Sequence, residues 1–287
     1  MIENKCICCS EKSSFYLEKK NEHGNFSIFR CKNCKSGFVH PYPDEEQLTN
    51  YYENDKYRNT SVNEIIEQEN IFPNTTLDAE RIIYNFNKFK NSSQNNLLDI
   101  GCGYGWFCKI AKEHNFNVTA TELNKNCRKI SFDLSKIHPL KRLVDDKFSE
   151  EFQDHFDFII LSQILEHLKI DNKLLNNINK ILIPGGIICV AVPNFGSFLS
   201  FLQGKKDMFI IPPEHINFFT LEGLKILFLK NNFEIIKHET VSRYNKSKFK
   251  KFLLFRFLLF PFLDLFFSIS DKLKKGMFLN IYFKKKH

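Results

Sequence analysis

Residues 97–107 (LLDIGCGYGWF) constrain the fold more than any other stretch of the chain. The apolar residues around Asp99 predict a buried parallel strand, and residues 105–114 predict the helix that follows. Between them lie three glycines at alternate positions: Gly101, Gly103 and Gly105. Because glycine permits a positive φ and brings no Cβ, such a turn can press its backbone N–H groups against a ligand. The alternative is a plain strand–helix turn that binds nothing.

A second strand is expected at residues 117–123 (NVTATEL), and Glu122 lies at its end. This acid follows Gly101 by about 20 residues, the spacing at which a carboxylate in a βαβ unit accepts hydrogen bonds from ribose hydroxyls. A glutamate that merely lies on the surface is the alternative. Residues 125–135 predict the next helix, and a weakly marked third strand is expected at residues 140–144.

The rest of the chain continues the alternation of strands and helices. Residues 157–162 (DFIILS) contain a continuous apolar run, typical of a strand buried on both faces. The segment 171–183 predicts an amphipathic helix, and residues 187–192 predict another strand. Further elements are expected as a helix at residues 220–230 capped by Thr220, a strand at 233–241 and an edge strand at 276–283.

From residue 96 to residue 194 the chain resembles the class I S-adenosylmethionine-dependent methyltransferases. The G-x-G-x-G turn, the acid after the second strand, the Glu166-His167 pair and the triplet at residues 184–186 (PGG) fall in the order of that family. The resemblance implies an α/β fold, namely a Rossmann-like, doubly wound sheet of seven strands whose last strand is antiparallel. It also implies S-adenosyl-L-methionine as the cofactor, with Asp99 beside its methionine end and Glu122 on its ribose.

The resemblance implies particular cofactor-binding and catalytic residues. The cofactor-binding set is Asp99, Gly101, Cys102, Gly103, Gly105, Glu122, Leu123, Asp145, Ser162 and Gln163. In enzymes of this type an acid after the third strand bonds the adenine amino group, and Asp145 and Asp146 are both candidates for that role. The catalytic candidates are Glu166, His167 and His215. One of the histidines is expected to be the general base, since an imidazole with a pKa near 6.5 can take a proton from an acceptor hydroxyl; a loop and helix-cap pair without a catalytic role is the alternative.

The first 40 residues carry two Cys-x-x-Cys pairs. Cys6 and Cys9 form the first pair, and Cys31 and Cys34 form the second. Four thiolates at this spacing suit a tetrahedral zinc ion, so we expect a zinc ribbon here. The zinc is expected to be structural, because four cysteine ligands leave no open coordination position. The alternatives are a redox-active dithiol and a chance spacing of the cysteines.

Three parts are expected along the chain: the ribbon at residues 1–40, a linker or lid at 41–76, and a methyltransferase core at 77–287. The linker carries Tyr51, Tyr52 and Tyr57. We expect these aromatic side chains either to fold over the cofactor or to pack the linker against the core.

An apolar and basic insertion is expected at residues 246–274 of the core. Residues 249–269 are rich in Phe and Leu, but Arg256, Pro261 and Asp264 interrupt them, and lysines crowd both ends. These charges, together with the lack of asymmetry between the two ends, argue against a membrane-spanning helix. We expect residues 249–269 either to make peripheral contact with a membrane surface or to cover the acceptor site.

Composition indicates anionic partners and a reducing compartment. The net charge of +8 over 287 residues favours nucleotide-linked substrates, nucleic acid or an acidic membrane face. Residues 1–15 contain no apolar signal segment, and five of the nine cysteines lie outside the two Cys-x-x-Cys pairs, which suits a reducing environment. We therefore expect a cytoplasmic protein, peripheral at the inner face of the membrane if residues 249–269 bind lipid.

The resemblance implies methyl transfer to a small-molecule acceptor of the kind found in sugar, nucleotide-sugar, polysaccharide or secondary-metabolite pathways. The chain lacks the Asn/Asp-Pro-Pro-aromatic tetrapeptide of amino-directed nucleic-acid methylases, and the ribbon lacks a dense Lys/Arg face. Nucleic acid is therefore not the expected partner. Two other functions stay open at this point: an RNA methyltransferase, and a non-catalytic protein that only binds the cofactor.

Overall fold

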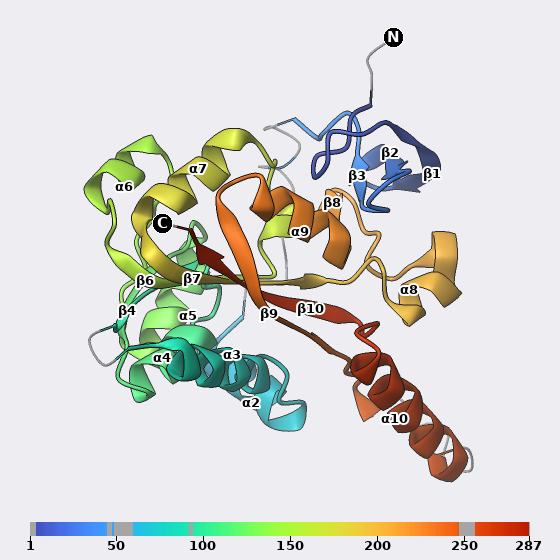
Figure 1. Cartoon of the computed structure of the whole chain (residues 1–287). Helices are drawn as coiled ribbons and strands as arrows, with labels where there is room; N and C mark the ends of the chain where they lie inside the picture. Colours follow the sequence, from blue (N-terminus) through green and yellow to red (C-terminus); the bar gives the residue numbers. More distant parts are fainter. Residues whose placement is uncertain (1–3, 45–47, 49–59, 92–93, 247–255, 287) are drawn as a thin grey trace.

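A computed structural model describes residues 4–286 except 45–47, 49–59, 92–93 and 247–255. Among these residues the main sheet has six strands in the order β5-β4-β6-β7-β10-β9. Their bounds are β4 Asn96–Ile100, β5 Asn117–Thr121, β6 Phe156–Ser162, β7 Leu182–Pro193, β9 Phe233–Val241 and β10 Phe278–Lys285. The sheet runs through the middle of the molecule with helices on both sides (Figure 1). The α/β class and the doubly wound arrangement are confirmed.

Because β4, β5, β6 and β7 run in the same direction, their carboxyl ends lie at one edge of the sheet. Strand β4 pairs in parallel with β5 on one side and with β6 on the other, and β6 pairs in parallel with β7. Strand β10 is antiparallel to both of its neighbours, β7 and β9, as expected for the last strand. It is not an edge strand, however, because β9 pairs with its outer side, and residues Leu279–Phe283 of β10 are buried.

The expected seventh strand is reduced to a single bridge. Leu140 pairs in parallel with Thr121; its N–H donates to the carbonyl of Ala120 at 2.8 Å, and its carbonyl accepts from the N–H of Glu122 at 3.0 Å. The chain then leaves the sheet and turns into helix α6 (Asp146–Glu151), whose N-cap is Asp145. A strand over residues 140–144 is therefore wrong, since the cap of α6 begins before a ladder can form.

The alternation of side chains along β4 sends successive residues to opposite faces. Leu97 packs in a cluster with helices α3 (Thr75–Phe89) and α4 (Trp106–Glu113). Leu98 packs in a cluster with α6, α7 (Asn172–Ile181) and α9 (Leu221–Leu229). Helix α5 (Lys125–Ser135) follows β5 and contacts α4.

A helix that the sequence analysis did not predict lies beside the glycine turn. Helix α2 (Val62–Ile71) begins with a capping box, in which the Ser61 side chain accepts from the Glu64 N–H and the Glu64 side chain accepts from the Ser61 N–H. Ile65 of α2 packs with Trp106 and Ile130. The pattern Ser-x-x-Glu was the available signal for this helix.

The N-terminal segment forms a second sheet that the core completes. Its order is β1-β2-β3-β8, from β1 Ser13–Asn21, β2 Gly24–Cys31, β3 Gly37–Val39 and β8 Asn217–Phe218, counting only described residues. Strand β8 comes from the core and pairs antiparallel with β3. Thr220, the N-cap of α9, also donates its hydroxyl to the carbonyl of Cys34 at 2.7 Å. Hydrogen bonds to both main chain and side chain thus fix the N-terminal sheet to the core.

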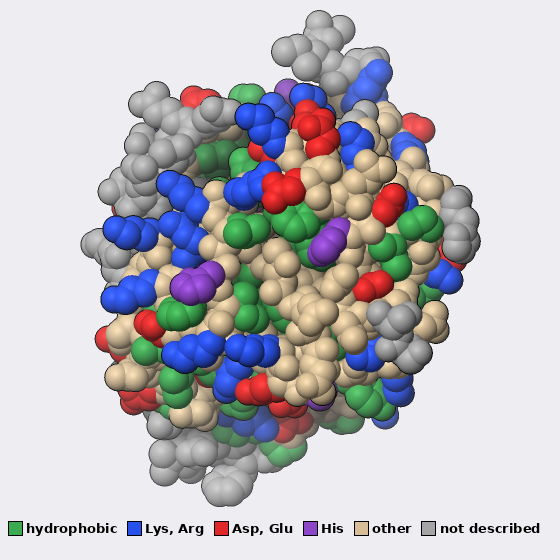
Figure 2. Space-filling model, turned by 90° about the vertical axis from the view of Figure 1, so that its left-hand side faces the viewer, with side chains coloured by type: hydrophobic (Ala, Val, Ile, Leu, Met, Phe, Trp, Pro, Cys, Tyr) green, Lys and Arg blue, Asp and Glu red, His purple; other side chains and the backbone are tan. Residues whose placement is uncertain are grey.

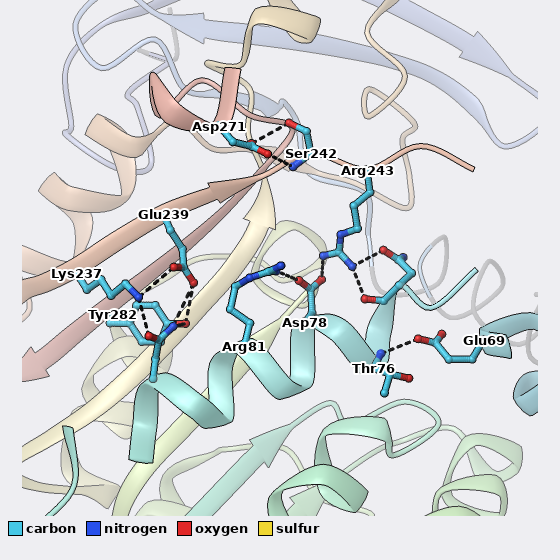
Figure 3. Close-up of polar contacts among 12 residues, drawn as sticks. Glu69, Thr76, Asp78, Arg81, Lys237, Glu239, Ser242, Arg243, Asp271 and Tyr282 are labelled. Carbon is cyan, nitrogen blue, oxygen red and sulfur yellow. Dashed lines mark hydrogen bonds and ion pairs between the residues drawn. The ribbon is translucent and has the colours of Figure 1, made fainter. Parts of the chain in front are cut away.

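A polar network ties α3 to the far strands of the main sheet (Figure 3). Arg243, just after β9, pairs with Asp78 of α3, and Arg81 also pairs with Asp78 at 2.8 Å. One turn further along α3, Asn85 donates to the Tyr282 hydroxyl of β10 at 2.7 Å. In a half-buried setting such bonds fix geometry more than they add stability, because removing either partner leaves a buried polar group unsatisfied.

Three short helices and one long helix lie beyond the carboxyl ends of the strands. They are η2 Leu165–His167, α8 Phe198–Gln203, followed by η3 Gly204–Lys206, and α10 Arg256–Lys272. Helix α10 projects away from the body of the molecule (Figure 1). In the described part of the chain no helix is both long enough and apolar enough to cross a membrane. Tyr51, Tyr52 and Tyr57, and residues 247–255 of the predicted insertion, lie outside the described residues.

Candidate functional site

The glycine turn between β4 and α4 has the conformation that the sequence predicts. All three glycines have positive φ, 68° at Gly101, 52° at Gly103 and 82° at Gly105. A Cβ on Gly101 would lie 2.3 Å from Ile164, and one on Gly105 would lie 2.3 Å from Ser131. A Cβ on Gly103 would meet nothing within 4 Å. The outer glycines therefore permit close packing inside the protein, while the backbone at Gly103 faces open space.

Glu122 lies next to this open backbone. Its Oε2 accepts a hydrogen bond from the Gly103 N–H at 3.0 Å, and its Oε1 accepts one from the Asn124 N–H at 2.7 Å. Each carboxylate oxygen can accept a further hydrogen bond. The side chain is nearly buried, so its position is defined by these two backbone donors. A carboxylate held in this way can receive hydroxyl groups of a ligand that lies along the turn.

Asp99, the other acid of the site, is buried inside β4. The thiol of Cys108 donates to its Oδ2 at 3.4 Å. Burial raises the pKa of this carboxyl to about 7, with the nearby charge of Glu122 adding to the effect and the Cys108 thiol opposing it. Asp99 is thus poised to change charge near neutral pH, and a cationic group nearby would favour its ionised form.

The remaining predicted cofactor residues lie around the same sheet edge. Cys102 is buried and its N–H donates to the Thr121 carbonyl at 3.0 Å, whereas Leu123 is exposed. Ser162 ends β6, and the exposed Gln163 follows it with a positive φ of 54°. Asp145 is exposed, and its carboxylate accepts from the Phe148 N–H at 2.8 Å as the cap of α6. Its role toward adenine stays a prediction.

A second cluster, which we call the Glu–His–His cluster, consists of Glu166, His167 and His215. Glu166 and His167 come from η2, directly after β6, and His215 comes from the loop before β8. Within the cluster one ligand atom from each side chain lies within 4.8 Å of the other two. The structure thus brings together all three catalytic candidates. A hydrogen bond between the His167 ring and the carbonyl of Glu214, 47 residues further along the chain, links the two segments.

Burial shifts the pKa values of two side chains of this cluster, Glu166 and His215. Glu166 is 1% exposed, and among the described residues neither of its carboxyl oxygens has a hydrogen-bond partner. Burial raises the pKa of Glu166 to about 8. Burial also lowers the pKa of His215, opposed by a hydrogen bond to the Phe209 carbonyl.

Backbone hydrogen bonds hold the two segments of the cluster together. The Ile216 N–H donates to the carbonyl of Glu166 at 2.9 Å. The Asn217 side chain donates to the carbonyls of Leu165 at 3.2 Å and Leu168 at 2.7 Å. Asn217 is thus a positioning residue that the sequence analysis missed, because its role depends on a contact with a segment far away in the chain.

The four N-terminal cysteines also meet, and they form a buried sulfur cluster. Ligand atoms of Cys6, Cys9, Cys31 and Cys34 lie within 4.8 Å of one another. The closest sulfur pairs are Cys6–Cys34 at 3.5 Å and Cys9–Cys31 at 3.4 Å. Backbone N–H groups of Cys8 and Asn33 donate to the sulfurs of Cys6 and Cys31. Four sulfurs in this arrangement could hold one tetrahedral metal ion.

Comparison with known proteins identifies the fold and the family. A family model described as "Methyltransferase domain" matches residues 76–238 of the 287, more than half of the chain. An uncharacterised protein of Methanocaldococcus jannaschii is 29% identical over 155 residues, which are 52% of this chain and 63% of that protein. The chain therefore spans less than two thirds of this relative's length.

Solved structures of low sequence identity share the fold. A crystal structure of a SAM-dependent methyltransferase from Archaeoglobus fulgidus superposes with a TM-score of 0.54 at 18% identity, covering 77% of this chain and 99% of that one. Phosphoethanolamine N-methyltransferase 2 of Haemonchus contortus, solved with S-adenosyl-L-methionine, gives 0.53 at 16% identity, covering 94% and 71%. The chain therefore belongs to the methyltransferase-domain family, and it has the fold of the class I S-adenosylmethionine-dependent methyltransferases.

Proposed function

We propose that this protein transfers a methyl group from S-adenosyl-L-methionine to a small-molecule acceptor. The observation that carries the proposal is the open backbone at Gly103 beside the fixed carboxylate of Glu122. A nucleoside needs both features, a surface without side chains against which to lie and an acid for its ribose hydroxyls. Membership of the methyltransferase family supports the same cofactor.

The residues of the glycine turn fit the two ends of this cofactor. Glu122 would accept the ribose hydroxyls, since each of its oxygens can accept one more hydrogen bond. Asp99 would interact with the ammonium group of the methionine end, because a nearby cation offsets the cost of ionising a buried carboxyl. The bound sulfonium would supply an activated methyl group, so the protein has to align the acceptor and deal with its proton.

The Glu–His–His cluster is the candidate for handling the acceptor's proton. It follows β6 at the same edge of the sheet as the glycine turn, and Ile164 of the same loop packs against Gly101. Acceptors in doubly wound folds bind beyond the carboxyl ends of the strands. This position, rather than any single side chain, supports a catalytic role for Glu166, His167 and His215.

The acceptor is proposed to be small and anionic, with a sugar or a nucleotide-linked sugar as the first class to test. The net charge of +8 favours such molecules. The Haemonchus contortus neighbour is named for phosphoethanolamine, a small phosphorylated acceptor. An RNA acceptor is the competing possibility, because a basic protein with a metal-binding ribbon also suits nucleic acid.

The four-cysteine cluster is proposed to bind one structural zinc ion. Four buried sulfurs and N–H donors to two of them provide the environment that a tetrathiolate site needs. The cluster packs in the same core as α9, so the ion would join the N-terminal sheet to the core. None of the nine cysteines, all within the described residues, forms a disulfide, which suits the proposed cytoplasmic location.

Cofactor affinity is expected to rise with pH through the ionisation of Asp99. The raised pKa of about 7 means that the carboxyl is neutral at pH 5.5 and mostly ionised at pH 7.5. By the same linkage, the free energy of unfolding of the ligand-free protein falls as pH rises from about 4 to 7, since the unfolded chain loses this proton first. Calorimetry should show S-adenosylmethionine binding about 20-fold more tightly at pH 7.5 than at pH 5.5, because the ionised fraction of Asp99 rises by that factor.

Two variants distinguish the effect of Asp99 ionisation on cofactor affinity from a general loss of cofactor binding. Asp99→Asn should bind weakly and with a flat pH profile. Glu122→Gln should bind weakly but keep the pH dependence, because Asp99 is intact. An absence of binding by the wild-type protein at either pH would refute the proposed function.

Zinc should be lost from the protein when one of the four clustered cysteines is replaced. Cys9→Ser should lower the zinc content from one ion per chain toward none and reduce the melting temperature, as measured by elemental analysis and calorimetry. Cys189→Ser is the matched control, since Cys189 is also buried but lies in β7, outside the four-cysteine cluster. Equal zinc loss in both variants would contradict the assignment of ligands.

Methyl transfer is expected to nucleotide sugars or lipid-linked glycans and not to RNA. The test follows the labelled methyl group from S-adenosylmethionine in a screen of these acceptors. With the acceptor found, His167→Ala and His215→Ala should each reduce kcat by about 100-fold while cofactor affinity stays unchanged. Near-normal rates in both variants would remove the cluster from the mechanism, and transfer to RNA alone would replace the acceptor class.

A further inference from the structure

We propose that the Glu–His–His cluster binds one divalent transition-metal ion, separate from the ion of the four cysteines. This inference deepens the proposed function, because the ion would lie at the acceptor end of the cofactor site. It rests on three features of Glu166, His167 and His215: an unsatisfied buried carboxyl, the orientation of both imidazoles, and the spacing between their ligand atoms.

The buried carboxyl of Glu166 has no hydrogen-bond partner among the described residues. With 1% exposure and no hydrogen bond to either oxygen in the described part of the chain, it would carry an uncompensated charge if ionised. Protonation followed by a hydrogen bond to a histidine does not explain the geometry, because Oε1 of Glu166 lies 4.0 Å from Nε2 of His167, beyond hydrogen-bond distance. A cation among the three side chains would satisfy the carboxylate.

Both imidazoles are oriented as metal ligands are. Nδ1 of His167 lies 2.6 Å from the Glu214 carbonyl, and Nδ1 of His215 lies 2.8 Å from the Phe209 carbonyl. A carbonyl only accepts, so Nδ1 carries the proton in each ring, and the Nε2 atom of each neutral imidazole presents a lone pair. Donation of one ring N–H to a backbone carbonyl is the usual support of a histidine whose other nitrogen binds a metal.

The spacing fits one shared ion. Nitrogen and oxygen ligands lie about 2.1 Å from ions of this kind, so two ligands of one ion are separated by up to about 4.2 Å. The 4.0 Å between His167 and Glu166 falls within that limit. All three ligand atoms lie within 4.8 Å of one another, so a side-chain movement of less than about 1 Å would bring the whole set within reach of one ion. Two imidazoles and a carboxylate suit first-row ions such as Mn²⁺, Fe²⁺, Co²⁺ or Zn²⁺.

Three protein ligands leave open positions at the ion, in contrast to the four-cysteine cluster. An acceptor hydroxyl bound there would lose its proton more easily, because a bound cation stabilises the oxyanion. The acceptor oxygen would then attack the methyl carbon, the bond from that carbon to sulfur would break, and S-adenosylhomocysteine would leave with the electron pair on sulfur. The proton would pass to solvent or to a base outside the cluster. The ion thus favours oxygen nucleophiles as acceptors.

Mn²⁺ binding to the zinc-loaded, full-length protein tests the site without any need for the acceptor. Paramagnetic resonance of free Mn²⁺ should show uptake of one ion per chain, since the thiolate cluster retains zinc and disfavours Mn²⁺. Glu166→Gln and His215→Gln should weaken this uptake at least tenfold. His114→Gln is the matched control, because His114 is exposed at the far end of α4, and it should bind as the wild type does.

The result that overturns the proposal is absence of Mn²⁺ uptake by the wild type, or equal uptake by Glu166→Gln and His215→Gln. Cofactor calorimetry on the same samples distinguishes a failure of the proposed metal site from a failure of the proposed methyltransferase function. Binding of S-adenosylmethionine without Mn²⁺ would remove the ion and keep the methyltransferase, whereas Mn²⁺ uptake without S-adenosylmethionine binding would remove the methyltransferase.

A different part of the molecule points to a lipid partner, and we infer that α10 and α8 bind an anionic membrane surface. Helix α10 exposes Phe262, Leu265 and Ile269, whose spacing of three and four residues puts them on one face, and the exposed Leu273 follows directly after the helix. At the tip of α8, Phe201 is 82% exposed and Leu202 is 68% exposed. The Phe198 N–H at the start of α8 donates to the Lys275 carbonyl just after α10, so the two helices lie close at their bases.

The charges around these apolar side chains select an anionic bilayer as the partner. Exposed lysines follow each helix in the chain: Lys205 and Lys206 come after α8, Lys272 ends α10, and Lys274 and Lys275 come just after it. The acids nearby are already engaged, Asp271 with Ser242, Asp207 with Ser200, and Asp264 with Lys246. The opposite face of the molecule differs, since its hydrophobic side chains form small separate groups among charged ones (Figure 2). Exposed apolar side chains with a basic rim on one side are typical of peripheral membrane binding.

Vesicle flotation of the full chain tests this surface. The wild type should float with vesicles of phosphatidylcholine and phosphatidylglycerol but not with phosphatidylcholine alone, and 0.5 M salt should weaken the binding. Phe262→Ser combined with Leu265→Ser should reduce flotation at least tenfold. Phe15→Ser is the matched control, because Phe15 is similarly exposed on β1. Flotation unchanged in the α10 variant, or a wild-type dimer that this variant dissociates without any vesicle binding, would overturn the inference.

Discussion

The position of β4 between two parallel neighbours is the constraint on which the rest of the site depends. Parallel pairing with β5 and β6 sets the three carboxyl ends at one edge, so that Asp99, Glu122 and Ser162 approach one another although they are distant in the sequence. A parallel ladder also buries both faces of β4, which is why Leu97 and Leu98 belong to different hydrophobic clusters. The glycine turn after β4 then provides a stretch of backbone without side chains, at Gly103, where a ligand can approach.

The elements predicted best from the sequence are those whose signals are local. Helix α5 and strand β9 begin and end at the residues expected, and Thr220 caps α9 because a hydroxyl at that position satisfies a free N–H group. The acid at the end of β5 follows from its position in the βαβ unit. The Ser61 and Glu64 capping box was equally local, and it was missed only because the segment around it is polar.

What the sequence could not show depends on contacts between distant segments. Strand β10 has the alternation of an edge strand, yet β9 covers it, because pairing is decided by the order of strands and not by the strand's own pattern. The pairing of β8 with β3, which joins the N-terminal sheet to the core, involves only two residues and has no periodicity to detect. The orientation of His215 depends in the same way on the Phe209 carbonyl and on a hydrogen bond between Ile216 and Glu166.

The two buried carboxyls at this sheet edge, Asp99 and Glu166, favour cationic partners for it. Burying an ionised carboxylate without a partner costs several kcal/mol, and a fold selected for stability alone would replace it with an apolar side chain. Among the described residues Asp99 accepts a weak hydrogen bond from the Cys108 thiol and the Glu166 carboxyl oxygens accept none, so the protein itself offers little to offset their ionisation. Under the proposals made above, an ammonium group would compensate the charge of Asp99 and a metal ion that of Glu166. The cost of burying the two carboxyls would then be recovered on binding.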